Sequence, residues 1–559
     1  MPPMEPTSQS ESREAVPSCR LIFLLESAWY AFGLAVVLAL GVVNLFYPFG
    51  SDQAALYYGV LELDRGATLY VDYWDNKQPG LFVFYLLAGR LFGFSEFGVH
   101  LLELIWMSAF AVVMMATLRP YLQAPWLSAL APAATIGVYY ATVGEDELTQ
   151  LEMLVAFPLY LAAWFALHVV TSRRSGSPPK GTSVLFFLSG FCAAVATLFK
   201  LLLAPIPVAF WLVASFYLLR GKKLTILSLV TRLWAPVAAG VSLPLLAVLW
   251  WFWQASALHE LLWTAFFYPP QAFSTSPDAP VTRLLTSPAF FAKNTTPWLL
   301  FVAAAAAIWW RGAHRSQNGP LIVMMFLWLG IAGIMFLVQR FSWWQYHMLL
   351  LFAPFGILAV CGLDGIVGYV ARLMQRVGPA GSKWLSHPLL AAMVSSAVIA
   401  MPPMASLTNP FVTKARPMVT IFRDDRLGLQ AYHWGISGIY EHLWKESRFL
   451  TWPTARPGPI YVFGNAIAHH FTGRRSPHQT VGSAWEFFLP SQTREILTVL
   501  DRTETPYILV GSADSKLFRL RPQIVAFLKE KYRVLKKDDS GIWYERLPED
   551  QNPRDAPTP

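Results

Sequence analysis

Long apolar runs recur along most of the chain, and short polar connectors separate them. A helix needs about 20 apolar residues to cross the roughly 30 Å hydrocarbon layer of a bilayer, and many of these runs approach that length. The pattern therefore predicts an all-α polytopic membrane protein with about eleven crossings. We expect them near residues 21–47, 97–118, 126–143, 151–170, 184–199, 201–219, 234–253, 297–310, 320–338, 347–371 and 388–406.

One apolar stretch breaks this pattern. The sequence "GLFVFYLLAGRLFG" at residues 80–93 is too short for a comfortable crossing, and a crossing there would invert the side of every later connector. We expect this segment to lie along the membrane interface.

The connectors are of two kinds, and the two kinds alternate along the chain. One kind is short and basic: residues 173–180, 220–223, 311–315, and the group Arg372, Arg376 and Lys383. The other kind holds most of the acidic and aromatic residues: 48–96, 144–150, 254–296 and 339–346. Basic loops usually stay in the cytoplasm. The connectors with the acidic and aromatic residues are therefore predicted to lie on the outer side of the membrane. The N-terminus is then inside and the C-terminus outside.

The composition changes near residue 407. Apolar runs of strand length appear there, "PIYVFG", "PYILVG" and "GIWYERL", with helix-like stretches "SQTREILTVLD" and "RPQIVAFLKEKY" between them. Strands alternating with helices are typical of a small α/β fold. We therefore divide the chain into a disordered N-terminus (1–20), a membrane module (21–406) with a large first outer loop (48–96), a soluble α/β domain outside the membrane (407–548) and a disordered tail (549–559).

Composition and charge agree with this class of protein. The chain has 559 residues, of which 55% are hydrophobic and 14% charged, whereas a soluble protein has about a quarter charged residues. The net charge of +9 follows from the basic loops and does not indicate a nucleic-acid partner. The three cysteines give no disulfide framework.

The outer connectors carry the candidate chemistry. Ionisable side chains near or below the headgroups cost a few kcal/mol unless they are paired or solvated, so they are candidates for function. Lys200 joins this face because it falls near the outer turn of the hairpin formed by residues 184–219. The candidates are Asp52, Asp75, Asn76, Lys77, Glu147, Glu152, Lys200, Arg340 and His347.

Each candidate also has a structural interpretation. Asp52 fits an N-cap of the helix that follows it, Asp75 fits a turn, and Lys77 fits a side chain that extends to the interface. The histidines and arginines between residues 469 and 478 suggest an anionic or metal site, although an ordinary solvated loop is the favoured interpretation. Because several candidates converge on one membrane face, a functional role is favoured for the set over separate structural roles.

The outer loop "SDQAALYYGVLELDRGATLYVDYWDNKQPG" (51–80) resembles that of GT-C glycosyltransferases that use dolichyl- or polyprenyl-phosphate sugars. These include the protein O-mannosyltransferases and the bacterial aminoarabinose transferases. The segments "LFKLLLAPIP" and "QYHMLLLFAPFGILA" are similar to further motifs of that family. Two positions depart from it, Gln53 where an acid is common and Gln78 where a proline is common. A divalent cation therefore stays open but is not supported by an acidic pair at Asp52-Gln53, and no cofactor is certain.

The resemblance implies an inverting transfer of a sugar from a polyprenyl-phosphate donor to a lipid, glycan or protein acceptor on the outer face of a bacterial inner membrane. Asp52 would then be the base. The phosphate would be held by Lys77, Arg340 and Lys200, and the substrates would be oriented by Asn76, Asp75, Glu152, His347 and Glu147.

A transporter or flippase of a lipid-linked or anionic solute is the alternative. Transporters tend to have matched halves with broken helices at the midplane. Here the polar residues gather at one face and the halves do not repeat, which favours the enzyme.

Overall fold

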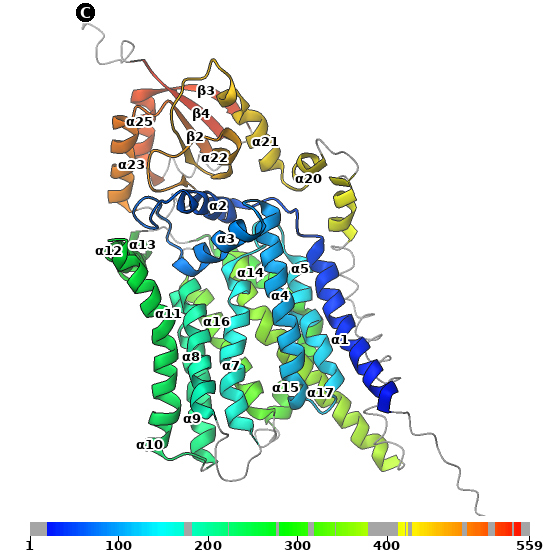
Figure 1. Ribbon diagram of the computed structural model, residues 1–559. Coiled ribbons are helices and arrows are strands. Elements are labelled where there is room, and N and C mark those ends of the chain that lie inside the picture. Colours follow the sequence, from blue (N-terminus) through cyan, green and yellow to red (C-terminus); the bar gives the residue numbers. More distant parts are fainter. Residues whose placement is uncertain are drawn as a thin grey trace, which may run out of the picture.

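Long helices packed side by side form the body of the molecule, and a small domain with a sheet stands on one end of it (Figure 1). The computed structural model describes residues 19–172, 181–221, 223–275, 279–310, 318–340, 342–377, 412–419, 421–422, 428–482, 489–511, 520–538 and 541–548. The body contains α1 (Cys19–Val42), α4 (Glu96–Leu118), α7 (Ala156–Thr171), α8 (Thr182–Phe199), α9 (Pro205–Arg220), α11 (Ala235–Gln254), α15 (Leu299–Trp310), α16 (Gly319–Val338) and α17 (Phe352–Val377).

Within the described ranges, seven helical stretches are long and apolar enough to cross a membrane. The predicted crossings at the start of the chain and at 297–310 are shorter apolar helices, Ser27–Val42 and Leu299–Trp310. The one at 126–143 is built from three short pieces, η2 (Pro125–Leu130), η3 (Ala133–Gly137) and α5 (Val138–Thr142). The crossing expected at 388–406 lies outside the described residues. The chain is an integral membrane protein, as its apolar runs predict.

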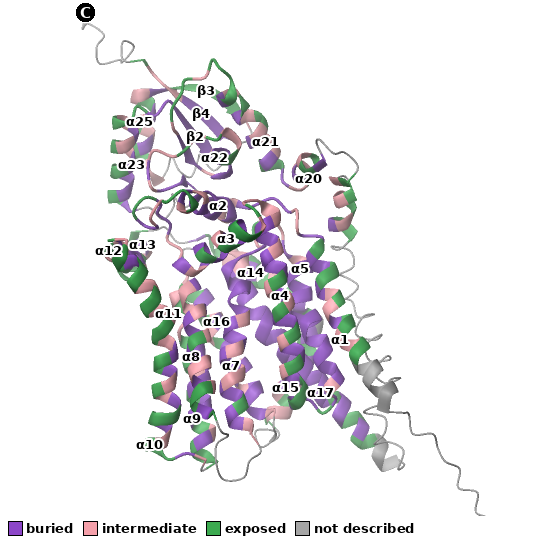
Figure 2. Cartoon of the chain, viewed as in Figure 1, coloured by how far each residue is buried: buried purple, intermediate pink, exposed green. Residues whose placement is uncertain are grey.

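Burial follows the position of each helix in the bundle (Figure 2). The segment Gln345–Leu373, which includes most of α17, is 94% buried over its apolar 18-residue stretch, whereas α11 exposes large apolar side chains such as Leu246 and Trp250. An apolar face without a protein partner fits contact with lipid.

A layer of shorter helices lies across the end of the bundle that faces the sheet domain (Figure 1). It contains α2 (Ser51–Asp64), α3 (Pro79–Phe92), α12 (Leu258–Leu262), α13 (Tyr268–Thr275) and α14 (Val281–Thr295). Helix α3 begins with Pro79 and stops at Gly93, whose φ of 93° suits glycine. It is 14 residues long, so the stretch expected at the interface does form a short helix in this layer.

The C-terminal domain contains a four-stranded sheet of order β1-β2-β4-β3. Strands β1 (Ile460–Phe463) and β2 (Tyr507–Gly511) are parallel, and β4 (Gly541–Arg546) pairs antiparallel with β2 and with β3 (Tyr532–Asp538). Helices α23 (Pro490–Arg502) and α25 (Pro522–Lys531) lie beside the sheet (Figure 1). The predicted α/β class is confirmed, but β3 was missed because its basic sequence directly continues a helical pattern.

The domain docks on α2 through the histidine- and arginine-rich loop and α22 (Ile467–Thr472). Arg475 forms an ion pair with Glu62 of α2, and the ring of His469 packs 4.7 Å from that of Tyr58. His469 is only 2% exposed. This loop is therefore largely an interface between the domain and the membrane module, and not the solvated loop that was favoured from the sequence.

Candidate active site

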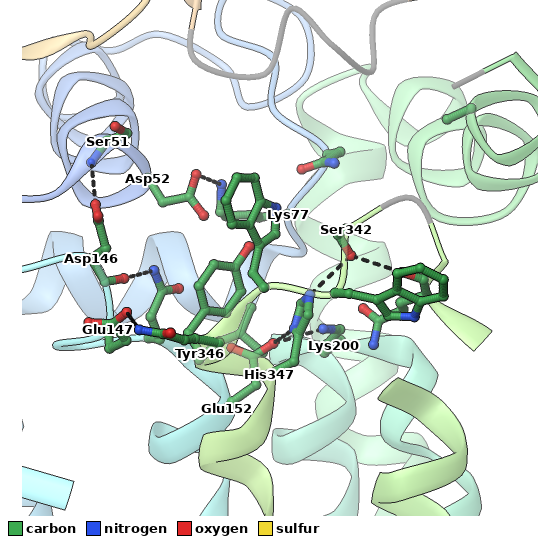
Figure 3. Close-up of a pocket in the computed structure, with 18 of the residues that line it drawn as sticks. Ser51, Asp52, Lys77, Asp146, Glu147, Glu152, Lys200, Ser342, Tyr346 and His347 are labelled. Atoms are coloured by element: carbon green, nitrogen blue, oxygen red, sulfur yellow. Dashed lines mark hydrogen bonds and ion pairs between the residues drawn. The ribbon is translucent and has the colours of Figure 1, made fainter. Parts of the chain in front are cut away.

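A cavity of about 1210 Å³ lies between the membrane module and the C-terminal domain. All four connectors predicted to face outward contribute residues to its wall, together with the start of α9 and the ends of β1 and β2. The topology predicted from the sequence thus brings distant polar segments to one hollow. Figure 3 shows Asp52 and Lys77 pointing toward one another, with Glu152, Lys200 and His347 grouped below them.

The first charged group in this cavity is Asp52, Lys77 and Asp75. The Lys77 Nζ lies 3.7 Å from the Asp52 Oδ1 and 3.5 Å from the Asp75 Oδ2. Asp52 stands in the first turn of α2, whose N-cap is Gly50, so it does not cap the helix. The Asp52 side chain is 30% exposed, whereas that of Asp75 is 5% exposed. Only Asp52 of these two acids lines the cavity; Asp75 supports Lys77 from behind.

Local contacts fix the loop that carries Lys77. The backbone N–H of Lys77 donates to the Asp75 carboxylate at 3.0 Å, and the Tyr70 hydroxyl donates to the Lys77 carbonyl at 2.6 Å. The backbone N–H of Trp74 donates to the Gln479 carbonyl at 2.8 Å, which ties this loop to the C-terminal domain.

The charge of Lys77 is secured by its partners. Burial alone would lower the pKa of its amine, but the carboxylates of Asp52 and Asp75 outweigh burial and raise that pKa above its ordinary value. Lys77 therefore carries a positive charge at neutral pH, beside a carboxylate that opens on the cavity.

The second charged group is centred on Glu152. Its Oε1 accepts from the Lys200 Nζ at 2.8 Å and from the His347 Nδ1 at 2.9 Å. Nδ1 of His347 must carry a proton to donate to this carboxylate, and its Nε2 lies 3.1 Å from the Ser342 hydroxyl. Lys200 stands between α8 and η4 (Leu201–Leu203), at the turn of the hairpin that α8 and α9 form. Ser342 was not singled out from the sequence, since a lone serine in a loop gives no signal.

An acidic loop lies to one side of the two charged groups (Figure 3). The Ser51 N–H donates to the Asp146 carboxylate at 3.4 Å, and the Gln345 amide donates to Glu147 at 3.1 Å. Burial raises the pKa of Glu145 to about 7, and it also raises those of Asp146 and Glu147. These acids hold protons more tightly than exposed carboxylates do.

The residues do not assemble a metal site in the described part of the chain. No group of three or more His, Cys, Asp or Glu side chains there is placed to hold a metal ion. Gln53, which follows Asp52, is 1% exposed, and its amide donates to the carbonyls of Glu145 and Leu148 at 2.9 and 2.6 Å. It thus fastens α2 to the acidic loop.

The arginine beside the cavity differs from the one expected. Arg340 is exposed and stacks over the ring of Phe273, 4.5 Å from its centroid. Arg283 of α14 lines the cavity instead and stacks over Trp344 at 3.6 Å. Sequence reasoning missed Arg283 because it lies in a long polar connector, away from any membrane-spanning helix.

Comparisons with known proteins address the fold. No family model and no curated protein sequence matches this chain. The solved structure of ArnT from Cupriavidus metallidurans bound to undecaprenyl phosphate superposes with a TM-score of 0.55. The match covers 94% of this chain and 98% of that one, at 14% sequence identity. The chain has a GT-C fold.

Two further structures are similar over comparable lengths. Apo ArnT from the same organism has a TM-score of 0.46 at 14% identity, over 93% of this chain and 98% of that one. AglB, an oligosaccharyltransferase from Archaeoglobus fulgidus with an inhibitory peptide and a dolichol-phosphate, also has a TM-score of 0.46. Its identity is 11%, over 93% of this chain and 74% of that one. The match to the ArnT complex with a TM-score of 0.55 confirms the GT-C fold that the outer loop predicts.

Proposed function

We propose that this protein is a glycosyltransferase that moves a sugar from a polyprenyl phosphate to an acceptor hydroxyl, with inversion, on the extracytoplasmic face of a bacterial inner membrane. The observation that carries this proposal is that Asp52 and Lys77 share one cavity, with Nζ and Oδ1 3.7 Å apart. A carboxylate and a cation side by side are what such a transfer requires.

Asp52 acts as the base. Its partly exposed carboxylate takes the proton of the acceptor hydroxyl while the hydroxyl oxygen attacks the anomeric carbon. The bond between that carbon and the phosphate oxygen breaks on the opposite side, and polyprenyl phosphate leaves with the electron pair. Attack from one side and departure from the other invert the anomeric centre.

Lys77 stabilises the charge that grows on the leaving phosphate. A charged donor that is fixed before the reaction stabilises such a charge most in a site that excludes water. Lys200 and Arg283 also line the cavity and are further phosphate partners; Arg283 takes the part first given to Arg340. Asp75 holds Lys77 in place.

The remaining polar residues orient the substrates. Asn76 and Glu147 line the cavity beside Asp52, and Glu152 positions His347 through the hydrogen bond to its Nδ1. His347 then presents a fixed ring to the sugar or acceptor.

The polyprenyl chain has an apolar path out of the charged region. Apolar residues of η4, α13 and the start of α9 form part of the cavity wall: Leu201, Leu202, Pro205, Pro269 and Phe273. ArnT, whose complex has the same fold, binds undecaprenyl phosphate. The same class of lipid suits this wall, with residues 21–406 forming the module that holds it and residues 407–548 the outer domain.

The test uses the purified full-length chain in lipid nanodiscs with a panel of polyprenyl phosphates that carry radiolabelled sugars. We expect release of polyprenyl phosphate together with a labelled product, and release that is about 10³-fold slower in the Asp52→Asn variant. In proteoliposomes, movement of the intact lipid-linked sugar across the membrane without cleavage would identify a flippase and refute the enzyme.

A further inference from the structure

One segment of the C-terminal domain contacts both parts of the chain that carry the proposed chemistry. This segment, residues 469–480, begins in α22 and continues through the loop that follows it, and we call it the clamp. Figure 1 shows α22 next to α2, whose first turn carries Asp52. The end of the clamp contacts the loop that carries Lys77. The histidines and arginines of the clamp have no part in the proposed transfer, so these contacts indicate a different role.

The first half of the clamp contacts the later turns of α2. The Ser476 N–H donates to the Tyr58 hydroxyl at 2.9 Å, and the ring of His469 packs 4.7 Å from that of Tyr58. The Arg475 guanidinium forms an ion pair with Glu62. Because α2 is a single helix of 14 residues, contacts that fix its later turns also fix where its first turn lies.

The second half of the clamp pairs with the loop that leads to Lys77. The Trp74 N–H donates to the Gln479 carbonyl at 2.8 Å, and Trp74 and Thr480 form an isolated parallel bridge. Trp74 directly precedes Asp75, whose carboxylate accepts from the Lys77 N–H at 3.0 Å. The position of the Trp74 backbone therefore helps to set the position of the amine that is proposed to bind phosphate.

Thr480 fastens the clamp to the sheet of the C-terminal domain. Its hydroxyl lies 3.1 Å from the Tyr461 hydroxyl of β1 and 2.9 Å from the His478 Nδ1. Thr480 is 1% exposed, so its hydroxyl depends on these partners instead of water. A continuous set of contacts thus runs from β1 through Thr480 to the Trp74 backbone.

The pair of Asp52 and Lys77 does not by itself fix the two segments relative to each other, since its 3.7 Å separation is longer than a hydrogen bond. The membrane module also contributes contacts. The Trp74 indole donates to the Thr264 hydroxyl of η6 (Trp263–Phe267) at 3.1 Å, and the Tyr73 hydroxyl donates to a carbonyl of α2 at 2.8 Å. The clamp differs from these contacts because it connects both segments to a third, independent body, the sheet.

We propose that the clamp sets the position of Asp52 relative to Lys77, with Thr480 and Arg475 as positioning residues. This inference rests on the proposed function, because it gives the C-terminal domain a part in that reaction. A displacement of about 1 Å in a reacting group can cost as much as 10²-fold in rate. Loosening the clamp should therefore weaken phosphate binding and slow the transfer together.

The test compares Thr480→Val with Thr493→Val in the full-length chain in nanodiscs. Thr493 lies in α23 of the same domain, is also 1% exposed, and donates to the Leu489 carbonyl at 3.3 Å. It is therefore the matched control for a loss of stability alone. Hydrogen exchange read by mass spectrometry follows peptides covering residues 70–77. We expect faster exchange there in Thr480→Val, and exchange like that of the unmodified chain in Thr493→Val.

The same samples give the Kd for undecaprenyl phosphate and kcat at saturating donor, below the melting range of both variants. We expect Thr480→Val to raise Kd and to lower kcat, each about fivefold, the value of one neutral hydrogen bond. Thr493→Val should change neither. Arg475→Ala should have a smaller effect of the same kind, because the Arg475 side chain is 63% exposed, and Arg475→Lys should restore both values. These two variants decide the question if Thr480→Val does not fold.

The inference is overturned if exchange across residues 70–77 is unchanged in Thr480→Val, which would mean that the membrane module fixes the loop by itself. It is also overturned if exchange rises while Kd and kcat stay the same, or if Thr493→Val has equal effects. Failure of the proposed function gives a different result: the unmodified chain then neither binds the lipid nor transfers sugar. In that case the exchange data still show whether the clamp fixes the loop of Lys77.

Discussion

The two charged groups of the cavity contain similar residues, but they differ in the length of their ion pairs and in the exposure of their carboxylates. Around Lys77 the ion-pair distances are 3.7 and 3.5 Å, and the Asp52 side chain is 30% exposed. Around Glu152 the distances are 2.8 and 2.9 Å, and the Glu152 side chain is 3% exposed. A loosely paired carboxylate can exchange its partner for a substrate, whereas a tightly held, buried one cannot without leaving a charge unpaired. The contrast assigns chemistry to Asp52 and positioning to Glu152.

The largest expected effect is on turnover in Asp52→Asn. Removing a general base lowers the rate by about 10²–10⁴-fold, and we expect about 10³-fold here, with a midpoint of thermal unfolding close to that of the unmodified chain. The measurement is release of labelled sugar from the donor, alongside a thermal melt in nanodiscs. Turnover near the original rate would show that Asp52 is not the base, and it would contradict the division of roles between Asp52 and Glu152.

The second effect is on stability in Glu152→Ala. This change leaves Lys200 without its partner, and breaking a buried ion pair typically destabilises by about 3–5 kcal/mol. We expect a clear drop in the unfolding midpoint, a smaller one in Glu152→Gln, and almost none in Asp52→Ala. Equal melting temperatures for Glu152→Ala and Asp52→Ala would show that the two groups do not differ as their geometry indicates.

The third effect concerns donor affinity in Lys77→Ala. A hydrogen bond to a charged group contributes about 1.5–3 kcal/mol, so we expect the Kd for undecaprenyl phosphate to rise roughly tenfold or more. Arg340→Ala is the control, because that side chain is exposed and stacks on Phe273, and its Kd should change far less. Equal losses in both variants would place the phosphate outside the Lys77 region.

The smallest effect is a pH dependence set by Glu145 in the acidic loop. Its pKa is raised by burial from 4.5 to about 7, so the folded chain binds more protons than the unfolded chain between these values. Stability should therefore fall as pH rises from about 4.5 to 7, and this penalty remains above pH 7. Glu145→Gln should flatten that part of the profile in thermal melts recorded from pH 4.5 to 8. An unchanged slope would contradict the assignment.

The sequence predicts the long elements well because hydropathy and strand-length runs are local signals. The helix α16, the strand β1 and the short helix α3 begin and end close to where their sequence patterns predict them. The convergence of Asp52, Lys77 and Glu152 also follows from the sequence, since sidedness puts their connectors on one face. Contacts that depend on packing do not follow, because no local pattern encodes which distant residue a side chain will meet.

Three particular cases illustrate that limit. Arg283 reaches the cavity because it stacks on Trp344, 61 positions away in the numbering. Asp75 lies behind Lys77 with a side chain that is only 5% exposed, and nothing in its sequence context indicates this burial. The ends of β1 and β2 reach the cavity because the C-terminal domain docks on α2, and nothing in the strand sequence shows which end of the sheet faces the membrane module.

The most direct test is an electron cryo-microscopy structure of the full-length chain in nanodiscs with undecaprenyl phosphate. The account predicts the lipid phosphate within hydrogen-bond distance of the Lys77 Nζ, with the Asp52 carboxylate facing the same space. A phosphate bound outside the cavity, or on the far side of Lys77 from Asp52, would contradict it.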